Sequence, residues 1–448
     1  MSKDRRWRGH GRTPVPSPIS APSRASRAAS PAGSHAVSTL DGMQLSTLDN
    51  GIQVLSERIS GVRSAAVGVW IRQGAAHETA SNTGVSHLLE HMVFKGTQKR
   101  SALEIADSLE GLGGSLDAYT SREHTSYQGR ILDEHLPEAM DVLSDLVLAP
   151  RIEASDLDLE REVVLEEIAQ VEDTPDDIVF EVHSERLWGD HPYGRSILGT
   201  KESVRGMAAA TLQTLHSERY VGRNLVIAAA GNVEHGDVVD RVESLFGQVV
   251  PGERTAPVAL PTATTDGLQF VERDSAQTHI VFGAQGPGHA HDDRYPLVLL
   301  SSALGGGMSS RLFQRVREEL GLCYSVFTYQ SFYHAAGILG VYVGTRPATA
   351  AQAAEAVRSE LKQVADEGLS ATDVDRIKRQ VKGQVMLSLE STGARLHRLA
   401  SFALHDESFV GLDEVLAHID RVTVDDIHRV AARYFDPDRH LELRLGSR

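Results

Sequence analysis

The sequence predicts an α+β protein made of two similar domains joined by a linker. Strand-like and helix-like periodicities alternate in both halves, and a stretch rich in Pro, Thr, Ala and Gly separates them. Both halves also end alike. The first closes with LQTLHSERYVGRNLVIAAAG, where Tyr220 precedes Gly231 by 11 residues, and the second closes with IHRVAARYFDPDRHLELRLG, where Phe435 precedes Gly446 by 11. Duplication of a unit of about 200 residues accounts for both endings.

The elements of the first half follow in order from local patterns. Residues 42–58 predict two strands around an Asp-Asn-Gly turn, and residues 63–72 alternate like a half-buried strand. Helical periodicity then predicts five helices, and a final strand and helix close this half. The expected helices lie near 83–95, 101–111, 134–147, 155–172 and 176–188, and the closing pair at 224–231 and 235–246.

These elements divide the chain into four segments. We expect domains at 38–249 and 268–448, with the linker at 250–267 (VPGERTAPVALPTATTDG). Residues 1–37 carry seven Lys or Arg and one Asp, and are rich in Ser, Pro, Ala and Arg. This composition predicts a disordered basic tail, because it offers too little apolar surface to offset the entropy of ordering. An organellar transit peptide is the alternative.

Composition narrows the function classes. The 448 residues carry a formal net charge of −16, which argues against a nucleic-acid partner because phosphate binding needs clustered cations. The single cysteine, Cys323, excludes an intrachain disulfide and a thiolate metal site. No stretch approaches the roughly 20 apolar residues of a membrane helix, so we expect no membrane partner. One cysteine fits a reducing compartment, and we expect a bacterial cytoplasm, with a mitochondrial matrix as the alternative.

Residues 87–91, His-Leu-Leu-Glu-His, predict a metal site. On a helix His87 and His91 are four residues apart, so both imidazoles project from one face and suit Zn²⁺. Glu90 shares that side and can take a proton from water beside the metal without ligating it. Asn82 or Thr83 is expected to cap this helix. Two histidines on a solvated helix face are the alternative reading.

Catalytic zinc needs a third protein ligand from elsewhere in the chain. The predicted helix at 155–172, with Ser155 as its expected N-cap, carries four candidates. Glu160 and Glu167 are two helical turns apart and share a face. Spacing alone leaves the choice among all four open. The candidates are Glu160, Glu162, Glu166 and Glu167.

The surrounding sequence resembles a known family. GVSHLLEHMVFKGT followed by EREVVLEEI is similar to the pitrilysin, insulysin and mitochondrial processing peptidase family of zinc metalloendopeptidases, the inverzincins. The short two-domain length is most similar to the processing-peptidase branch. The resemblance implies that His87, His91 and Glu167 bind one Zn²⁺ per chain. It also implies that Glu90 is the catalytic base and that Glu160 supports the site without binding metal.

The resemblance extends to substrate contacts. GGSLDAYTSREHTSY (113–127) is similar to the family's substrate-pairing strand, in which Ala118 matches the usual Ala and Asp117 replaces the usual Asn. VREELGLCYSV (316–326) places Arg317 and Tyr324 where the family has an Arg and a Tyr that hold the substrate from the non-metal half.

An acidic pair completes the predicted site. Asp177 and Glu181, four residues apart, resemble the pair with which processing peptidases receive an arginine near the cleaved bond. A solvated acidic turn is the alternative.

The resemblance also sets the expected fold and function. Each domain is expected to be a mixed, mostly antiparallel sheet with helices packed on it, and the two to enclose a chamber. The second half lacks the His-x-x-Glu-His motif, so one half would bind metal and the other only substrate. We expect a zinc-dependent endopeptidase acting on unfolded or extended peptides, with a preference for basic residues near the cleaved bond. A homodimer or a homologous partner chain is expected, and the alternative function is a non-catalytic partner subunit.

Overall fold

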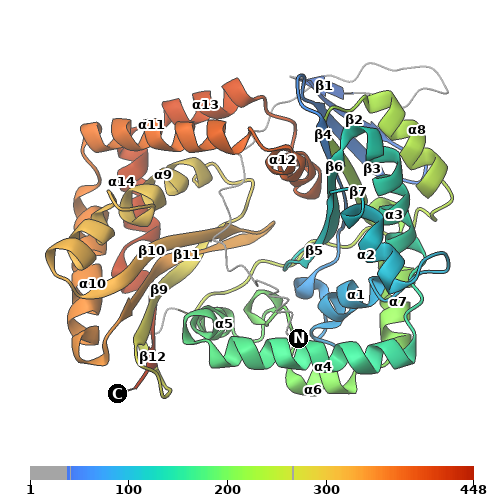
Figure 1. Cartoon of the computed structure of the whole chain (residues 1–448). Helices are drawn as coiled ribbons and strands as arrows, with labels where there is room; N and C mark the ends of the chain where they lie inside the picture. The colour runs from blue at the N-terminus through green and yellow to red at the C-terminus, as the bar shows by residue number, and fades with distance from the viewer. Residues whose placement is uncertain (1–37, 41, 265–266, 448) are drawn as a thin grey trace.

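The computed structural model describes residues 38–40, 42–264 and 267–447 (Figure 1). The predicted tail at 1–37 lies outside these residues. The described chain forms two β-sheets, each flanked by helices, and Figure 1 shows the first sheet on the right and the second on the left. The α+β class is therefore confirmed.

The first sheet has seven strands in the order β1-β2-β3-β7-β4-β6-β5. Neighbouring strands are antiparallel except β3 and β7, which are parallel. The strands are β1 (Ser38–Leu40), β2 (Met43–Thr47), β3 (Gln53–Arg58), β4 (Ser64–Ile71), β5 (Ser115–Thr120), β6 (Thr125–Leu132) and β7 (Leu225–Gly231).

The second sheet repeats this topology. Its order is β10-β11-β9-β12-β8, and only β8 and β12 are parallel. The order matches β5-β6-β4-β7-β3 strand for strand, so the last strand of each half pairs in parallel with the first strand of the shared unit. Shared topology confirms the two homologous halves that the matched endings predict. The strands are β8 (Leu268–Glu272), β9 (Thr278–Pro287), β10 (Cys323–Phe332), β11 (Ala336–Thr345) and β12 (Leu441–Gly446).

Helices fill the rest of both halves, and each helix predicted in the first half is present with similar bounds. The first half contains α1 (Val85–Val93), α2 (Ala102–Glu110), α3 (Leu136–Leu148), α4 (Ala154–Asp173), α5 (Pro175–Trp188), α6 (Lys201–Gly206), α7 (Ala209–Arg219) and α8 (His235–Phe246). The second contains α9 (Arg294–Gly305), the π-helix η5 (Phe313–Glu319), α10 (Ala350–Glu367), α11 (Ala371–Ser388), α12 (Thr392–Leu404), α13 (Leu412–Arg421) and α14 (Val424–Tyr434).

The two halves exchange one helix each. Helix α5, from the first half, packs on β9 and β12 of the second sheet, whereas α12, from the second half, packs on β3, β4 and β7 of the first. Val179 of α5 lies in a core cluster with second-sheet residues. Arg72, at the end of β4, donates to the Leu404 carbonyl of α12 at 2.7 Å. Each sheet therefore has one face covered by the opposite half.

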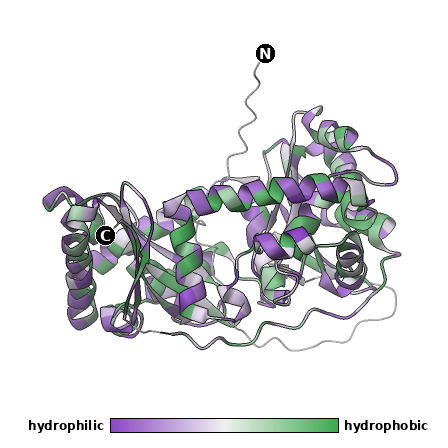
Figure 2. Ribbon diagram, turned by 90° about the horizontal axis from the view of Figure 1, so that it is seen from below, coloured by the Kyte–Doolittle hydropathy of each residue, from purple (hydrophilic) through white to green (hydrophobic). Residues whose placement is uncertain are grey.

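Residues 250–264, within the predicted linker, form neither helix nor strand. The sheets lie on either side of this segment in sequence, while the exact domain bounds stay a prediction. Hydrophobic and hydrophilic residues alternate along the helices (Figure 2). None of the helices in the described residues is long and apolar enough to cross a membrane.

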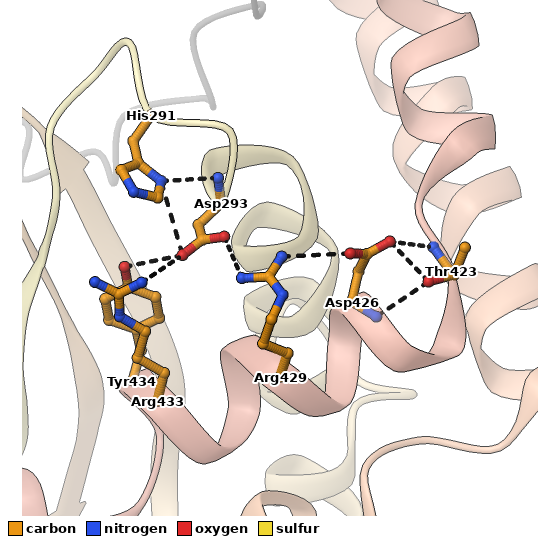
Figure 3. A network of polar contacts seen from close by, with 7 residues as sticks. All are labelled: His291, Asp293, Thr423, Asp426, Arg429, Arg433 and Tyr434. Carbon is orange, nitrogen blue, oxygen red and sulfur yellow. Dashed lines mark hydrogen bonds and ion pairs between the residues drawn. The ribbon is translucent and has the colours of Figure 1, made fainter.

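A buried carboxylate joins α9 to α14 in the second half (Figure 3). Asp293, at the start of α9, is 2% exposed and accepts hydrogen bonds from Arg429 at 2.5 Å and from the Tyr434 hydroxyl at 3.0 Å. Arg433 lies 3.4 Å from the same carboxylate. Several charge-assisted hydrogen bonds on one carboxylate offset its burial, so this network fixes how the two helices pack.

Candidate metal centre

Helix α1 positions the two histidines, and a buried carboxylate holds its first turn. Glu78 accepts the backbone N–H groups of Gly84 at 2.7 Å and Ser86 at 2.8 Å. The predicted caps Asn82 and Thr83 are wrong, because Gly84 is the N-cap residue with φ 88° and no side-chain cap. A Cβ at Gly84 would lie 2.5 Å from the Leu198 carbonyl oxygen, so only glycine fits this approach.

Helix α4 packs against α1 and presents one acidic face to it. It begins one residue before the predicted Ser155 cap, which is wrong: Glu153 is the N-cap residue. Glu160 is buried and Glu167 is partly buried on the side facing α1. Glu162 and Glu166 are exposed. Packing thus separates the four candidates that spacing leaves equivalent.

Three donor atoms converge between these helices. The Nε2 atoms of His87 and His91 each lie 3.7 Å from Glu167 Oε2, and the imidazole rings are 4.6 Å apart. Among the described residues these three form the group that could hold a metal ion, with their ligand atoms within 4.8 Å of one another. Ligands at about 2.0–2.2 Å from a tetrahedral zinc ion have comparable mutual separations. The donor set therefore fits Zn²⁺.

Burial and neighbouring charges shift the pKa values of the two histidines in opposite directions. Burial, together with the neighbouring His91, lowers the pKa of His87 to about 3, which leaves a neutral imidazole able to bind metal. Burial also acts to lower the pKa of His91, but the hydrogen bond that His91 donates to Glu160 and the charge of Glu167 outweigh it and raise that pKa.

Glu160 contacts the Nδ1 side of His91, on the ring nitrogen that is not among the three donor atoms. Its Oε2 lies 3.0 Å from His91 Nδ1, and its other oxygen pairs with Lys95. Burial opposes ionisation of Glu160, but the hydrogen bonds from His91 and Lys95 prevail and lower its pKa. A carboxylate on Nδ1 directs Nε2 of His91 toward the metal position, which is the supporting arrangement that metal-bound histidines require.

Glu90 lies beside the donor set without joining it. Glu90 is 8% exposed, and its carboxylate accepts a hydrogen bond from the Thr120 hydroxyl at 2.6 Å. Burial raises the pKa of Glu90 to about 7, against the effect of Thr120. A carboxyl group poised near neutrality suits proton transfer in either direction.

The predicted substrate strand is β5, which contains Ala118. It lies at the edge of the first sheet and pairs only with β6 among the described strands. Asp117 is exposed, and Ala118 is partly buried against the core that includes α1. One edge of β5 is thus open for main-chain pairing.

Arg317 and Tyr324 are brought together in the second half. The Arg317 guanidinium lies 4.9 Å from the centre of the Tyr324 ring and 4.5 Å from that of Phe313. Tyr324 is 78% exposed. Within the described part of the chain, no hydrogen bond, ion pair or ring contact joins either residue to His87, His91 or Glu167.

The two predicted acidic residues of α5, Asp177 and Glu181, differ in exposure. Asp177 is exposed, and burial together with Asp176 raises its pKa. Glu181 is partly buried, and its negative charge interacts with the buried guanidinium of Arg122. The two carboxylates therefore have different surroundings.

Sequence reasoning did not anticipate Glu78, Lys95 or Thr120. Lys95 lies four residues after His91, in the turn just beyond α1, so spacing along the chain could have placed it near His91. Thr120 lies inside the recognised strand motif, but its contact with Glu90 depends on how β5 packs against α1. Glu78 has no local signal, because its partners are the backbone of a turn six to eight residues away.

Fold and site define a two-half α+β protein with a candidate metal centre in one half. Residues 53–201 match the family described as "Insulinase (Peptidase family M16)", and residues 207–381 match "Peptidase M16 inactive domain". The chain belongs to the M16 peptidase family, which confirms the resemblance.

Relatives and solved structures agree with this assignment. The chain is 38% identical to an uncharacterized zinc protease of Streptomyces coelicolor over 89% of this chain and 88% of that one. It is 37% identical to an uncharacterized zinc protease of Bacillus subtilis, over 89% and 97%. The crystal structure of a protease from Helicobacter pylori has the same fold, with a TM-score of 0.84 at 22% identity over 91% of this chain and 100% of that one.

A structure from Pseudomonas fluorescens, described as a peptidase M16 inactive domain, has a TM-score of 0.85 at 20% identity and covers 91% and 98% of the two chains. Both structures share the two-sheet fold with this chain.

Proposed function

We propose that this protein is a zinc-dependent endopeptidase that hydrolyses peptide bonds in unfolded or extended peptides. The observation that carries the proposal is the convergence of His87, His91 and Glu167 beside the buried carboxyl of Glu90. Relatives named as zinc proteases support the same metal and reaction class.

In the proposed mechanism His87 Nε2, His91 Nε2 and a Glu167 oxygen hold one Zn²⁺. The ion, when bound, supplies a Lewis acid that polarises the substrate carbonyl and activates water at neutral pH. Glu90 accepts the proton of the attacking water on its carboxylate and then donates it to the leaving amine nitrogen. In the metal-free protein, burial raises the pKa of Glu90 to about 7.

Substrate would bind by strand addition to β5, with Ala118 at its centre. An extended peptide pairs through main-chain hydrogen bonds, so only unfolded segments could enter. The open edge of β5 supports this mode. Arg317 and Tyr324 would contact the peptide from the second half across the predicted chamber, and their mutual stacking and the exposure of Tyr324 leave the phenol available.

The deciding experiment compares wild type with Glu90→Gln. We expect purified wild type to contain one zinc per chain and to cleave unstructured basic peptides. Glu90→Gln should keep its zinc and lose cleavage by 100-fold or more, since general acid–base groups contribute about 10²–10⁴. Retained cleavage with zinc bound would remove Glu90 from the role of base. Zinc binding without cleavage by wild type would favour the alternative, a non-catalytic partner subunit.

The proposed preference for basic residues near the cleaved bond depends on Asp177 and Glu181 of α5. Asp177 is exposed and can contact a cation, whereas Glu181 is partly balanced by Arg122, so we propose that Asp177 contributes more. Moving a single Arg along a peptide series should change the cleavage rate in wild type and less so in Asp177→Asn. Equal rates at every Arg position would show that the pair is only solvated.

The oligomeric state and cellular location are proposed from the resemblance to the processing-peptidase branch. We propose a homodimer, or a pair with a homologous chain, located in a bacterial cytoplasm, in line with the bacterial sources of the relatives. Light scattering of the purified protein and fractionation of the source cells would test these two points separately.

A further inference from the structure

We propose that Thr120 is a positioning residue that sets the orientation of the Glu90 carboxylate from the substrate-binding strand. The inference rests on the proposed role of Glu90 as base. It goes further, because it connects the element that would order the peptide with the group that would move the proton.

The first step is the contact. Thr120 Oγ1 donates to Glu90 Oε2 at 2.6 Å, and Thr120 is the only side chain hydrogen-bonded to Glu90 among the described residues. A hydroxyl bonded to a carboxylate is a charge-assisted hydrogen bond, stronger than a neutral one. It holds one oxygen of Glu90 and so fixes the plane of the carboxylate.

The second step is the placement of Thr120 within β5. Side chains alternate along a strand, so Leu116, Ala118 and Thr120 share one face. Leu116 and Ala118 pack against the core cluster that contains the buried residues of α1, so this face of β5 is turned toward α1. Asp117, on the other face, is exposed. The Thr120 hydroxyl therefore reaches Glu90 because the strand turns this face to α1.

The third step is the open edge of the same strand. β5 pairs with β6 on one side only, and a peptide on its other side would be aligned by the backbone of residues 115–119. Peptide register and Glu90 orientation then depend on one strand. A carboxylate held by a part of the peptide-binding strand needs no separate adjustment when the peptide docks.

The experiment uses Thr120→Val, which keeps the shape and strand preference of threonine but removes the hydroxyl, and Thr120→Ser, which restores it. We expect kcat to fall about 10- to 100-fold in T120V, the loss of one hydrogen bond to a charged group, with KM and zinc content unchanged. T120S should recover most of kcat.

A matched control is Thr125→Val. Thr125 is the cross-strand partner of Thr120, and its hydroxyl donates to the Gln73 carbonyl at 2.8 Å rather than to Glu90. T125V removes a hydroxyl from the residue paired with Thr120, so it should lower the free energy of unfolding without lowering kcat. An equal fall in T125V would show that T120V acts through the sheet and would overturn the proposal.

A second readout keeps this inference separate from the proposed function. Crystal structures of the metal-free variants should show the Glu90 carboxylate displaced in T120V and unmoved in T120S and T125V. An unmoved Glu90 in T120V would overturn the inference even if wild type proves inactive. Inactive wild type with a displaced Glu90 in T120V would overturn only the proposed peptidase function.

Discussion

At the scale of single residues, the structure gives two adjacent glutamates different surroundings. Glu166 and Glu167 are neighbours on α4, but a helix turns each residue by about 100°, so they cannot share a face. Glu167 faces the two imidazoles, whereas Glu166 is exposed. This difference gives a direct test of the third ligand.

We expect Glu167→Gln to lose zinc and Glu166→Gln to keep it. The amide of glutamine removes the charged oxygen at 3.7 Å from both imidazoles, while Glu166 contributes nothing to the donor set. The metal content of the two purified variants, measured by atomic absorption, checks the prediction, and circular dichroism confirms that both are folded. Loss of zinc from Glu166→Gln alone would reassign the ligand.

Much of this centre could be predicted from the sequence, because helical spacing places His87, Glu90 and His91 together without knowledge of the fold. The choice of Glu167 needed the family resemblance, since four glutamates on one helix look alike. The Thr120 contact joins residues 30 apart in the chain, so it depends on how β5 packs against α1. No local pattern encodes that packing.

At the scale of secondary-structure elements, single contacts decide how helices and strands pack. Asp293 joins α9 to α14 through three side chains of α14 (Figure 3). We expect Asp293→Ala to lower the free energy of unfolding by about 2 kcal/mol, below the usual 3–5 for a buried pair because the arginines left behind are half exposed. Tyr434→Phe, which removes one neutral donor, should cost about 1 kcal/mol. Urea denaturation measures both, and equal costs would show that the arginines do not contribute.

The packing of α5 on the second sheet depends on a glycine in β9. A Cβ at Gly283 would lie 2.3 Å from His183 Cε1 and 2.9 Å from the Tyr329 hydroxyl. We expect Gly283→Ala to destabilise the protein by about 1–3 kcal/mol, the usual cost of overpacking. Gly383→Ala, in the interior of α11 with no atom within 4 Å of the new Cβ, should instead stabilise it by about 1 kcal/mol. Thermal unfolding of the two variants should therefore shift in opposite directions.

At the scale of the whole molecule, the exchange of α5 and α12 makes the two halves interdependent. The matched endings and the linker predicted two similar units, and the shared strand order confirms them. The exchange itself could not be predicted, because the amphipathic pattern of a helix shows that one face is buried but not which sheet buries it. Since each sheet is covered by a helix of the other half, separating the halves would expose both cores, and we expect the protein to unfold as one unit.

The junction between the halves contains a buried neutral histidine that makes stability depend on pH. His183 of α5 is fully buried with Nε2 3.2 Å from the Leu441 carbonyl of β12, and burial lowers its pKa to about 4. The unfolded chain binds a proton there below about pH 6.5 while the folded chain does not. Unfolding therefore takes up a proton between pH 6.5 and 4, and stability falls as the pH falls through this window.

We expect this single group to remove about 2–3 kcal/mol of stability between pH 7 and 4.5. His183→Gln, which keeps an N–H donor but cannot be protonated, should lose correspondingly less over the same range. Urea denaturation of the metal-free proteins at both pH values measures the difference, because removing metal with a chelator leaves protonation of His87 and His91 the same in both. His428→Gln, on the exposed side of α14, controls for the loss of one histidine. An identical acid dependence in wild type and His183→Gln would show that His183 is not the group that couples the contact between the halves to pH.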